Sequence, residues 1–207
     1  MLPVYLAGPD VFLRESVEVG RAKQAICARH GLDGRYPGDS PDVSGLPVGE
    51  QARALFEACV EMMDACVAGL VNLTPFRGPS ADVGTAFEMG YLFGRDRPVF
   101  GYTSEVGDYT TRVVDDAIQV ESFGLADNLM LEGPMMRRGA IIVRAAEPGP
   151  WPLAALTAFE LAVQIAALEL ASDPEAMNFS KSFSEGSNLS VAQTAVPSVR
   201  MLPCPVS

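Results

Sequence analysis

The stretch VAGLVNLTPFRGPSADVGTAFEMGYLFG, residues 67–94, decides the fold. Its first seven residues are apolar except for Asn72, which is typical of a strand buried on both faces of a parallel sheet. The run TPFRGPS, residues 74–80, predicts a loop, and residues 81–94 predict a helix. A buried strand that leads through a loop into a helix is the repeating step of an α/β protein.

The same alternation continues on both sides of this stretch. We expect further strands at residues 4–7, 98–102 and 140–144, further helices at 13–29, 49–65, 125–131 and 151–171, and polar loops at 34–47 and 103–117. Strands that alternate with helices imply a parallel sheet with helices on both faces. The sequence therefore predicts a single α/β domain over residues 1–171.

Residues 172–207 differ in composition from the rest of the chain. Serine, asparagine, proline and glycine are frequent there, and the apolar residues have no helical or strand period. Such a segment does not bury enough apolar surface to offset the entropy of ordering it. We expect a disordered or loosely packed C-terminal tail.

Charge and cysteine usage limit the classes of function. The formal net charge is −11, whereas nucleic-acid binding needs clustered Lys and Arg. We expect no secretory signal and no membrane span, because the N-terminus lacks a basic region and the chain lacks a long apolar run. The four cysteines have no metal-type spacing. We expect Cys59 and Cys66 to be buried thiols in a reducing cytoplasm. Without metal spacing or a dinucleotide glycine motif, we expect no metal and no cofactor.

Glu88 is the residue that points most directly to chemistry. It lies between Phe87 and Met89 in an otherwise uncharged helical stretch, residues 83–93. A carboxylate in apolar surroundings is either paired or tuned for reaction. Taken alone, however, the pattern favours a solvated helical charge at Glu88 and a helix cap at Asp82.

Three motifs in order along the chain resemble one family. YLAGP at residues 5–9, LTPFRGPSADVGTAFEMGY at 73–91 and FGLADNLML at 123–131 are together similar to the nucleoside 2-deoxyribosyltransferase family. The resemblance implies a flavodoxin-like (Rossmann-like) fold and a transferase of nucleotide salvage that exchanges the base of a 2'-deoxynucleoside. It also implies a homo-oligomer, a dimer or dimer-based assembly, with shared active sites. The second and third motifs are closer to the purine-preferring branch of the family.

The resemblance assigns roles to four residues. Glu88 would be the nucleophile that attacks C1' of deoxyribose and forms a covalent glycosyl-enzyme. Tyr5 would hold this carboxylate by a hydrogen bond, and Asp82 would bind deoxyribose hydroxyls. Asn128 would reach into the site of a neighbouring subunit and bind the 5'-hydroxyl.

One position departs from the family pattern. Where the family often has Asp or Asn facing the base, this chain has Cys59, and a neutral thiol is a poor substitute for a carboxylic acid. Asp10, Glu61 and Asp64 are the alternative sources of the proton or of base contacts. We rank Asp10 first, because it follows a turn expected to line the site.

The turn after the first strand contributes two more candidates. Gly8 is expected at the carboxyl edge of the sheet, where ligands of such folds bind. We expect the ring of Phe12 either to stack on the nucleobase or to pack under the first helix. Arg77 is interpreted as an anchor for its loop rather than as a ligand contact.

Other functions remain open on the sequence alone. The same bond could be hydrolysed, in deoxynucleosides or in their 5'-monophosphates, if water is the acceptor. Asp127, Asn128 and the acidic net charge favour a free 5'-hydroxyl, although Arg137 and Arg138 lie nearby. A non-catalytic nucleotide-binding module is the alternative of another class, and it would be expected to lack a carboxylate at Glu88.

Overall fold

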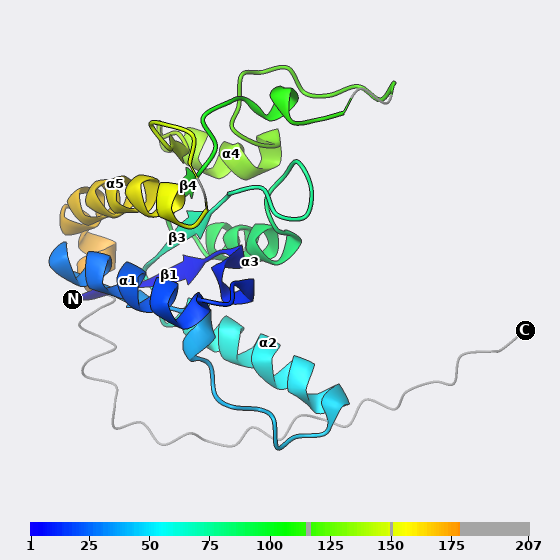
Figure 1. Ribbon diagram of the computed structural model, residues 1–207. Helices are drawn as coiled ribbons and strands as arrows, with labels where there is room; N and C mark the ends of the chain where they lie inside the picture. The colour runs from blue at the N-terminus through cyan, green and yellow to red at the C-terminus, as the bar shows by residue number, and fades with distance from the viewer. Residues whose placement is uncertain (115–116, 150, 179–207) are drawn as a thin grey trace, which may run out of the picture.

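The protein is built on one five-stranded parallel sheet with helices on both faces (Figure 1). The computed structural model describes residues 1–114, 117–149 and 151–178. The strand order is β2-β1-β3-β4-β5, with β1 (Leu2–Ala7), β2 (Leu32–Arg35), β3 (Ala68–Asn72), β4 (Val99–Thr103) and β5 (Val143–Arg144). The helices are α1 (Ser16–Arg29), α2 (Val48–Asp64), α3 (Val83–Gly94), α4 (Leu129–Met136) and α5 (Leu153–Ala171), with 3-10 turns η1 (Pro9–Phe12), η2 (Pro37–Asp39) and η3 (Tyr109–Thr111). The predicted parallel α/β architecture is confirmed.

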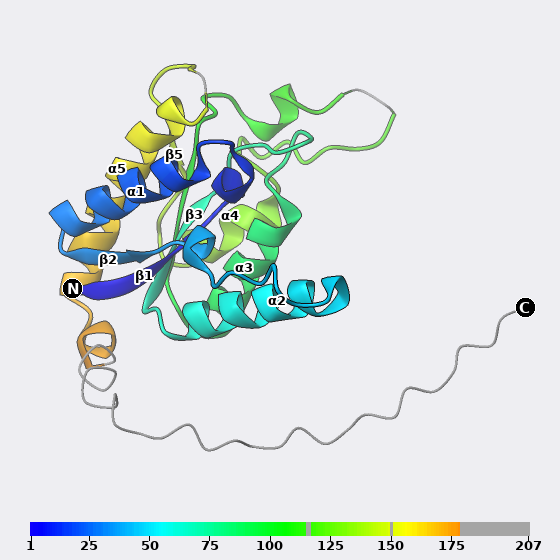
Figure 2. The same ribbon diagram turned by 60° about the horizontal axis from the view of Figure 1, so that its bottom comes forward.

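Two apolar clusters fill the space on either side of the sheet. Helices α1 and α5 cover one face, and α2, α3 and α4 lie on the other (Figures 1 and 2). Successive side chains of a strand point to opposite faces. Val4 and Leu6 of β1 therefore pack under α1 and α5, whereas Tyr5 and Ala7 join the cluster under α3. This alternation gives Tyr5 its direction toward the helix that carries Glu88.

The structure corrects three of the sequence predictions. Strand β2, which pairs with β1 at the sheet edge, was not predicted, because its residues Asp33, Gly34 and Arg35 are polar or small. The helix expected from residue 125 begins at Leu129, since the side chain of Asn128 accepts a hydrogen bond from the amide of Met130 and caps the helix there. The last strand is confined to Val143–Arg144.

The beginning of the expected tail is packed against the domain. Residues 174–178 are helical, and Ala176 is buried in the cluster under α1 and α5. The prediction of a loose tail for residues 179–207 concerns residues outside those described. Among the described residues, no helix is both long and apolar enough to cross a membrane.

Glycines on β3 and α3 offer a matched test of this packing. A Cβ atom at Gly69 would lie 2.6 Å from Leu92 Cδ1, a buried atom of α3, whereas a Cβ at Gly90 would meet nothing within 4 Å. We predict that Gly69→Ala lowers the free energy of unfolding by about 1–3 kcal/mol through overpacking. Gly90→Ala should raise it by up to about 1 kcal/mol, because alanine favours the helix. Urea unfolding followed by circular dichroism measures both, and a stabilising Gly69→Ala would contradict the close contact between β3 and α3.

Candidate active site

Glu88 is held at the centre of the candidate site by Tyr5. Helix α3 begins after Asp82, whose Oδ2 atom accepts hydrogen bonds from the amide (2.9 Å) and hydroxyl (3.2 Å) of Thr85. The second turn of the helix then carries Glu88 toward β1. There the hydroxyl of Tyr5 donates a hydrogen bond of 2.5 Å to Glu88 Oε1. The structure thus brings together the two residues that the sequence predicted as a pair.

The surroundings of Glu88 favour its protonated form. Burial raises the pKa of Glu88 from 4.5 to about 7; the hydrogen bond from Tyr5 opposes this shift, and the negative charge of Asp82 adds to it. Burial and the neighbouring carboxylate of Glu88 also raise the pKa of Tyr5 far above its ordinary value. Tyr5 therefore stays a hydroxyl donor, and Glu88 changes its charge near neutral pH.

Cys59 is the third member of this group. Burial raises the pKa of its thiol; the neighbouring Tyr5 hydroxyl opposes this shift, and the charge of Glu88 adds to it. The sequence predicted a buried Cys59, but the residue is half-buried, because it lines a pocket of about 220 Å³ between α2 and α3. The pocket is lined by Leu55, Phe56, Cys59, Val60, Met63, Gly84, Phe87 and Glu88. It is therefore an apolar pocket with one carboxylate.

Asp10 lies in a different environment. Its side chain is 1% exposed and forms an ion pair with Lys23, which is equally buried. Asp10 Oδ2 also accepts a hydrogen bond of 3.0 Å from the side-chain amide of Asn72. Gly8 is needed beside this cluster, because a Cβ there would lie 2.6 Å from Asn72 Cβ. Asp10 and Gly8 thus lie at the carboxyl edge of the sheet as predicted, but the carboxylate is engaged by Lys23 inside the protein.

Phe12 belongs to an aromatic cluster on the surface of the same edge. Its ring is 59% exposed and stacks on Phe76, with ring centroids 5.2 Å apart and an interplanar angle of 16°. The guanidinium of Arg77 lies over both rings, 5.7 Å from the Phe12 centroid and 4.8 Å from that of Phe76. These contacts hold the loops after β1 and β3 together, and they fit the interpretation of Arg77 as an anchor.

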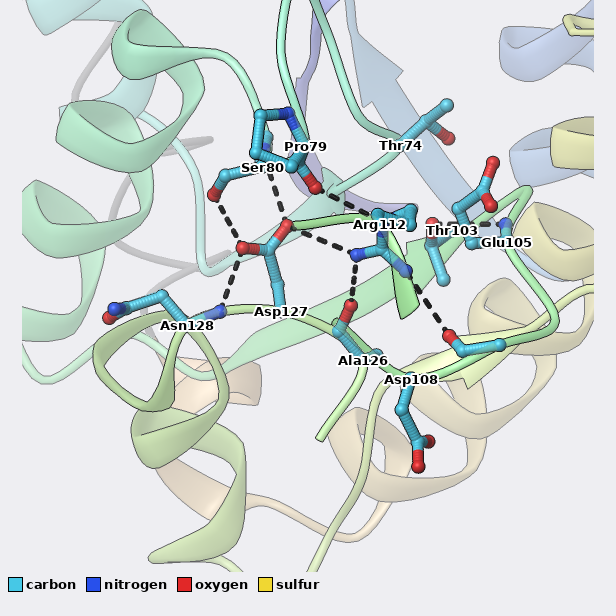
Figure 3. Close-up of polar contacts among 12 residues, drawn as sticks. Thr74, Pro79, Ser80, Thr103, Glu105, Asp108, Arg112, Ala126, Asp127 and Asn128 are labelled. Carbon is cyan, nitrogen blue, oxygen red and sulfur yellow. Dashed lines mark hydrogen bonds and ion pairs between the residues drawn. The ribbon is translucent and has the colours of Figure 1, made fainter. Parts of the chain in front are cut away.

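Asn128 and Asp127 follow on the loop that leads into α4. The carboxylate of Asp127 lies between Ser80 and the backbone of Asn128, with Arg112 alongside (Figure 3). The side chain of Asn128 points away from this cluster (Figure 3). The loop that precedes Asp82 is therefore connected directly to the segment that carries Asn128.

The other acidic candidates are not placed beside Glu88. Glu61 is exposed on α2. Asp64 accepts hydrogen bonds from Tyr91 (2.8 Å) and from Arg95 (2.6 Å) near the end of that helix. Within residues 1–114, 117–149 and 151–178, no group of three His, Cys, Asp or Glu side chains could hold a metal ion.

Sequence reasoning missed Lys23 and Arg112. Lys23 follows Val19 by four residues and precedes Ile26 by three, so it lies on the buried face of α1, and this spacing was the available signal. Arg112 lies in the segment that the sequence predicted as a polar loop. Two of its partners, Pro79 and Ala126, lie in other segments, and no local pattern identifies these contacts.

The raised pKa of Glu88 predicts a stability that depends on pH. A carboxyl whose pKa is higher in the folded than in the unfolded chain stabilises the fold below pH 4.5, and this contribution is lost as the pH rises to about 7. Glu88→Gln removes the titration and keeps an oxygen for the Tyr5 hydroxyl. We predict that the difference in the free energy of unfolding between the variant and the wild type shifts in favour of the variant by about 1–3 kcal/mol from pH 5 to pH 8. Urea unfolding at both pH values measures the gain, Glu61→Gln on the exposed face of α2 is the control, and equal differences at both pH values would contradict the shift.

Comparison with known proteins places this arrangement in a family. The family model described as nucleoside 2-deoxyribosyltransferase matches residues 4–130, more than half of the 207-residue chain. An uncharacterized protein of Schizosaccharomyces pombe is 29% identical over 167 residues, which are 67% of this chain and 79% of that protein. The solved structure of a 2-deoxyribosyltransferase from Leishmania mexicana superposes with a TM-score of 0.54 at 24% identity, over 78% of this chain and 98% of the other. This structural likeness supports the flavodoxin-like fold, and the residues matched by the family model include Tyr5, the loop before Asp82, Glu88 and Asn128. The chain belongs to the nucleoside 2-deoxyribosyltransferase family.

Proposed function

We propose that this protein transfers the 2-deoxyribosyl group between nucleobases through a covalent glycosyl-enzyme on Glu88. The observation that carries the proposal is the hydrogen bond of 2.5 Å between Tyr5 and Glu88, at the wall of an apolar pocket. The hydrogen bond occupies Oε1 and leaves Oε2 for attack. A held carboxylate is a suitable nucleophile for a sugar carbon that develops positive charge.

The proposed reaction has two balanced steps. In the first, Glu88 Oε2 bonds to C1' as the C1'–N bond breaks, and the base leaves with the electron pair and takes a proton from solvent. In the second, a nitrogen of another base attacks C1', the bond between C1' and Glu88 Oε2 breaks with its electron pair going to the carboxylate, and the acceptor returns a proton to solvent. The Tyr5 hydrogen bond fixes the direction of the carboxylate and stabilises its charge when it departs.

The other predicted residues have places in this proposal. Asp82, whose charge acts on Glu88, would bind the sugar hydroxyls at the start of α3. Cys59 would contact the base, since it lines the pocket beside Glu88. Phe12, which is 59% exposed, would stack on a base at the sheet edge. Asp10 is bound to Lys23, so we propose that it shapes this edge rather than exchanging a proton with the base.

The central prediction concerns turnover by Glu88 variants. With 2'-deoxyinosine and adenine, the wild type should release hypoxanthine and form 2'-deoxyadenosine, detected by liquid chromatography. Glu88→Ala should lower the rate by at least about 10³-fold with unchanged circular dichroism, because the nucleophile is lost. Glu61→Ala, an exposed acidic residue, is the control and should stay active. Hypoxanthine release that adenine does not divert would indicate hydrolysis, and release only from 2'-deoxyinosine 5'-monophosphate would indicate a nucleotide hydrolase. If no purine or pyrimidine donor gives a product, a non-catalytic binding module is the remaining function.

The proposal includes a second copy of the chain. An exposed apolar face on α2 and α3 flanks the pocket, with Phe56 55%, Val83 86% and Phe87 52% exposed. The rings of Phe56 and Phe87 lie 5.9 Å apart on this face. An apolar patch of this kind is typical of a protein–protein interface. A partner subunit that covers it would close the open side of the pocket and could contribute its own Asn128.

Sedimentation tests this assembly. We predict that the wild type is a dimer or a dimer-based oligomer, and that Val83→Glu dissociates it and abolishes turnover. A glutamate in the first turn favours α3 itself, so the fold should persist while the interface acquires a charge. Leu168→Glu on α5 is the matched control, because Leu168 is 77% exposed on the opposite side of the sheet. An active wild type that sediments as a monomer would exclude a shared site.

A further inference from the structure

The carboxylate of Asp127 is buried between two segments of the candidate site. Its side chain is 1% exposed. Asp127 Oδ1 accepts hydrogen bonds from the hydroxyl of Ser80 and from the amide of Asn128, the latter at 2.7 Å. Asp127 Oδ2 accepts a hydrogen bond of 3.0 Å from the amide of Ala81. Because these donors occupy both oxygens, the carboxylate serves the protein and is not available to a ligand (Figure 3).

Arg112 reinforces the same connection from the other side. Its guanidinium donates to the carbonyls of Pro79 (3.1 Å), Gly107 (3.2 Å) and Ala126 (2.5 Å). The Nη2 atom also lies 4.0 Å from Asp127 Oδ2. The loop after β3 and the segment before α4 are therefore joined twice, once through a carboxylate and once through a guanidinium. A buried charge with such partners is costly to disturb.

Each joined segment leads directly into a residue of the proposed site. Ala81 precedes Asp82, which caps α3 and influences Glu88. Asp127 precedes Asn128, whose Oδ1 atom caps α4 by accepting a hydrogen bond from the amide of Met130. The relative position of these two segments is thus set by the buried carboxylate of Asp127 together with the guanidinium of Arg112.

We propose that Asp127 is a positioning residue that fixes Asp82 within its own subunit and Asn128 for the neighbouring site. This inference rests on the proposed function. If Asn128 binds the 5'-hydroxyl, as the family resemblance implies, the consequence is a specificity: Asp127 maintains the preference for substrates that carry a 5'-hydroxyl, although it does not touch the substrate. A purely structural role would lower the turnover of all substrates by the same factor.

The variant Asp127→Asn tests this consequence. An asparagine has one acceptor oxygen, and its amide would direct N–H groups at the N–H of Ala81 or of Asn128. The experiment compares kcat/KM for 2'-deoxyinosine with that for 2',5'-dideoxyinosine, each with adenine as acceptor. We expect the wild type to prefer the 5'-hydroxyl, and Asp127→Asn to reduce that preference by up to about tenfold, the worth of a hydrogen bond.

Two further variants make the result decisive. Asp108→Asn is the matched control, because the Asp108 carboxylate binds Arg144 (2.7 Å) in the adjoining loop; its preference should match the wild type. Ser80→Ala removes one donor and keeps the carboxylate, so it should reduce the preference by a smaller factor than Asp127→Asn. This variant also tests the inference if Asp127→Asn does not fold.

The outcomes separate this inference from the proposed function. A wild type that does not turn over 2'-deoxyinosine defeats the proposed function itself. An active wild type without preference for the 5'-hydroxyl overturns the inference alone. The inference is also overturned if Asp127→Asn, or Ser80→Ala in its place, lowers both kcat/KM values equally.

Discussion

The ion pair between Lys23 and Asp10 is the interaction on which the carboxyl edge of the sheet depends. Both groups are buried, and removing either partner would leave a charge without compensation inside the protein. Asp10 also accepts from Asn72, Asn72 accepts from Thr74, and Thr74 accepts from the amide of Ser104. This chain of hydrogen bonds joins α1 to the loops after β1, β3 and β4. The candidate site is thereby built on segments whose relative positions are fixed.

The Lys23–Asp10 ion pair and the carboxylate of Glu88 lie on opposite faces of the sheet. Asn72 and the Lys23–Asp10 pair lie on the side of α1 and α5, where Lys23 also contacts the rings of Tyr102 and Phe159. Tyr5 lies on the other side and meets Glu88 there. The period of two along β1 and β3 directs Tyr5, which binds Glu88, and Asn72, which binds Asp10, to opposite faces. The ionisation of Glu88 is thus separated by the sheet from the ion pair that holds its edge.

The elements that a local pattern defines could be predicted from the sequence, and those defined by distant partners could not. Strand β3, helix α3 and the pairing of Tyr5 with Glu88 followed from apolar runs and from the family motifs. Strand β2 could not be recognised, since an edge strand needs little apolar surface. Asp10 was expected to supply the proton or base contacts because it follows the turn after the first strand; its pairing with Lys23, on the next helix, is a contact between separate elements. The function of Asp127 depends on Ser80, which lies 47 residues away along the chain.

The environment of Glu88 combines two opposing influences, and the proposed reaction needs both. Burial raises its pKa to about 7, which makes the ionised carboxylate a stronger base and a better nucleophile toward C1'. The same property makes it a poorer leaving group when the second base attacks. The hydrogen bond of 2.5 Å from Tyr5 lowers the pKa and stabilises the departing charge. An apolar pocket alone would favour formation of the glycosyl-enzyme and slow its breakdown. In the proposed reaction, the tyrosine beside the carboxylate would therefore allow Glu88 to serve as nucleophile in the first step and as leaving group in the second.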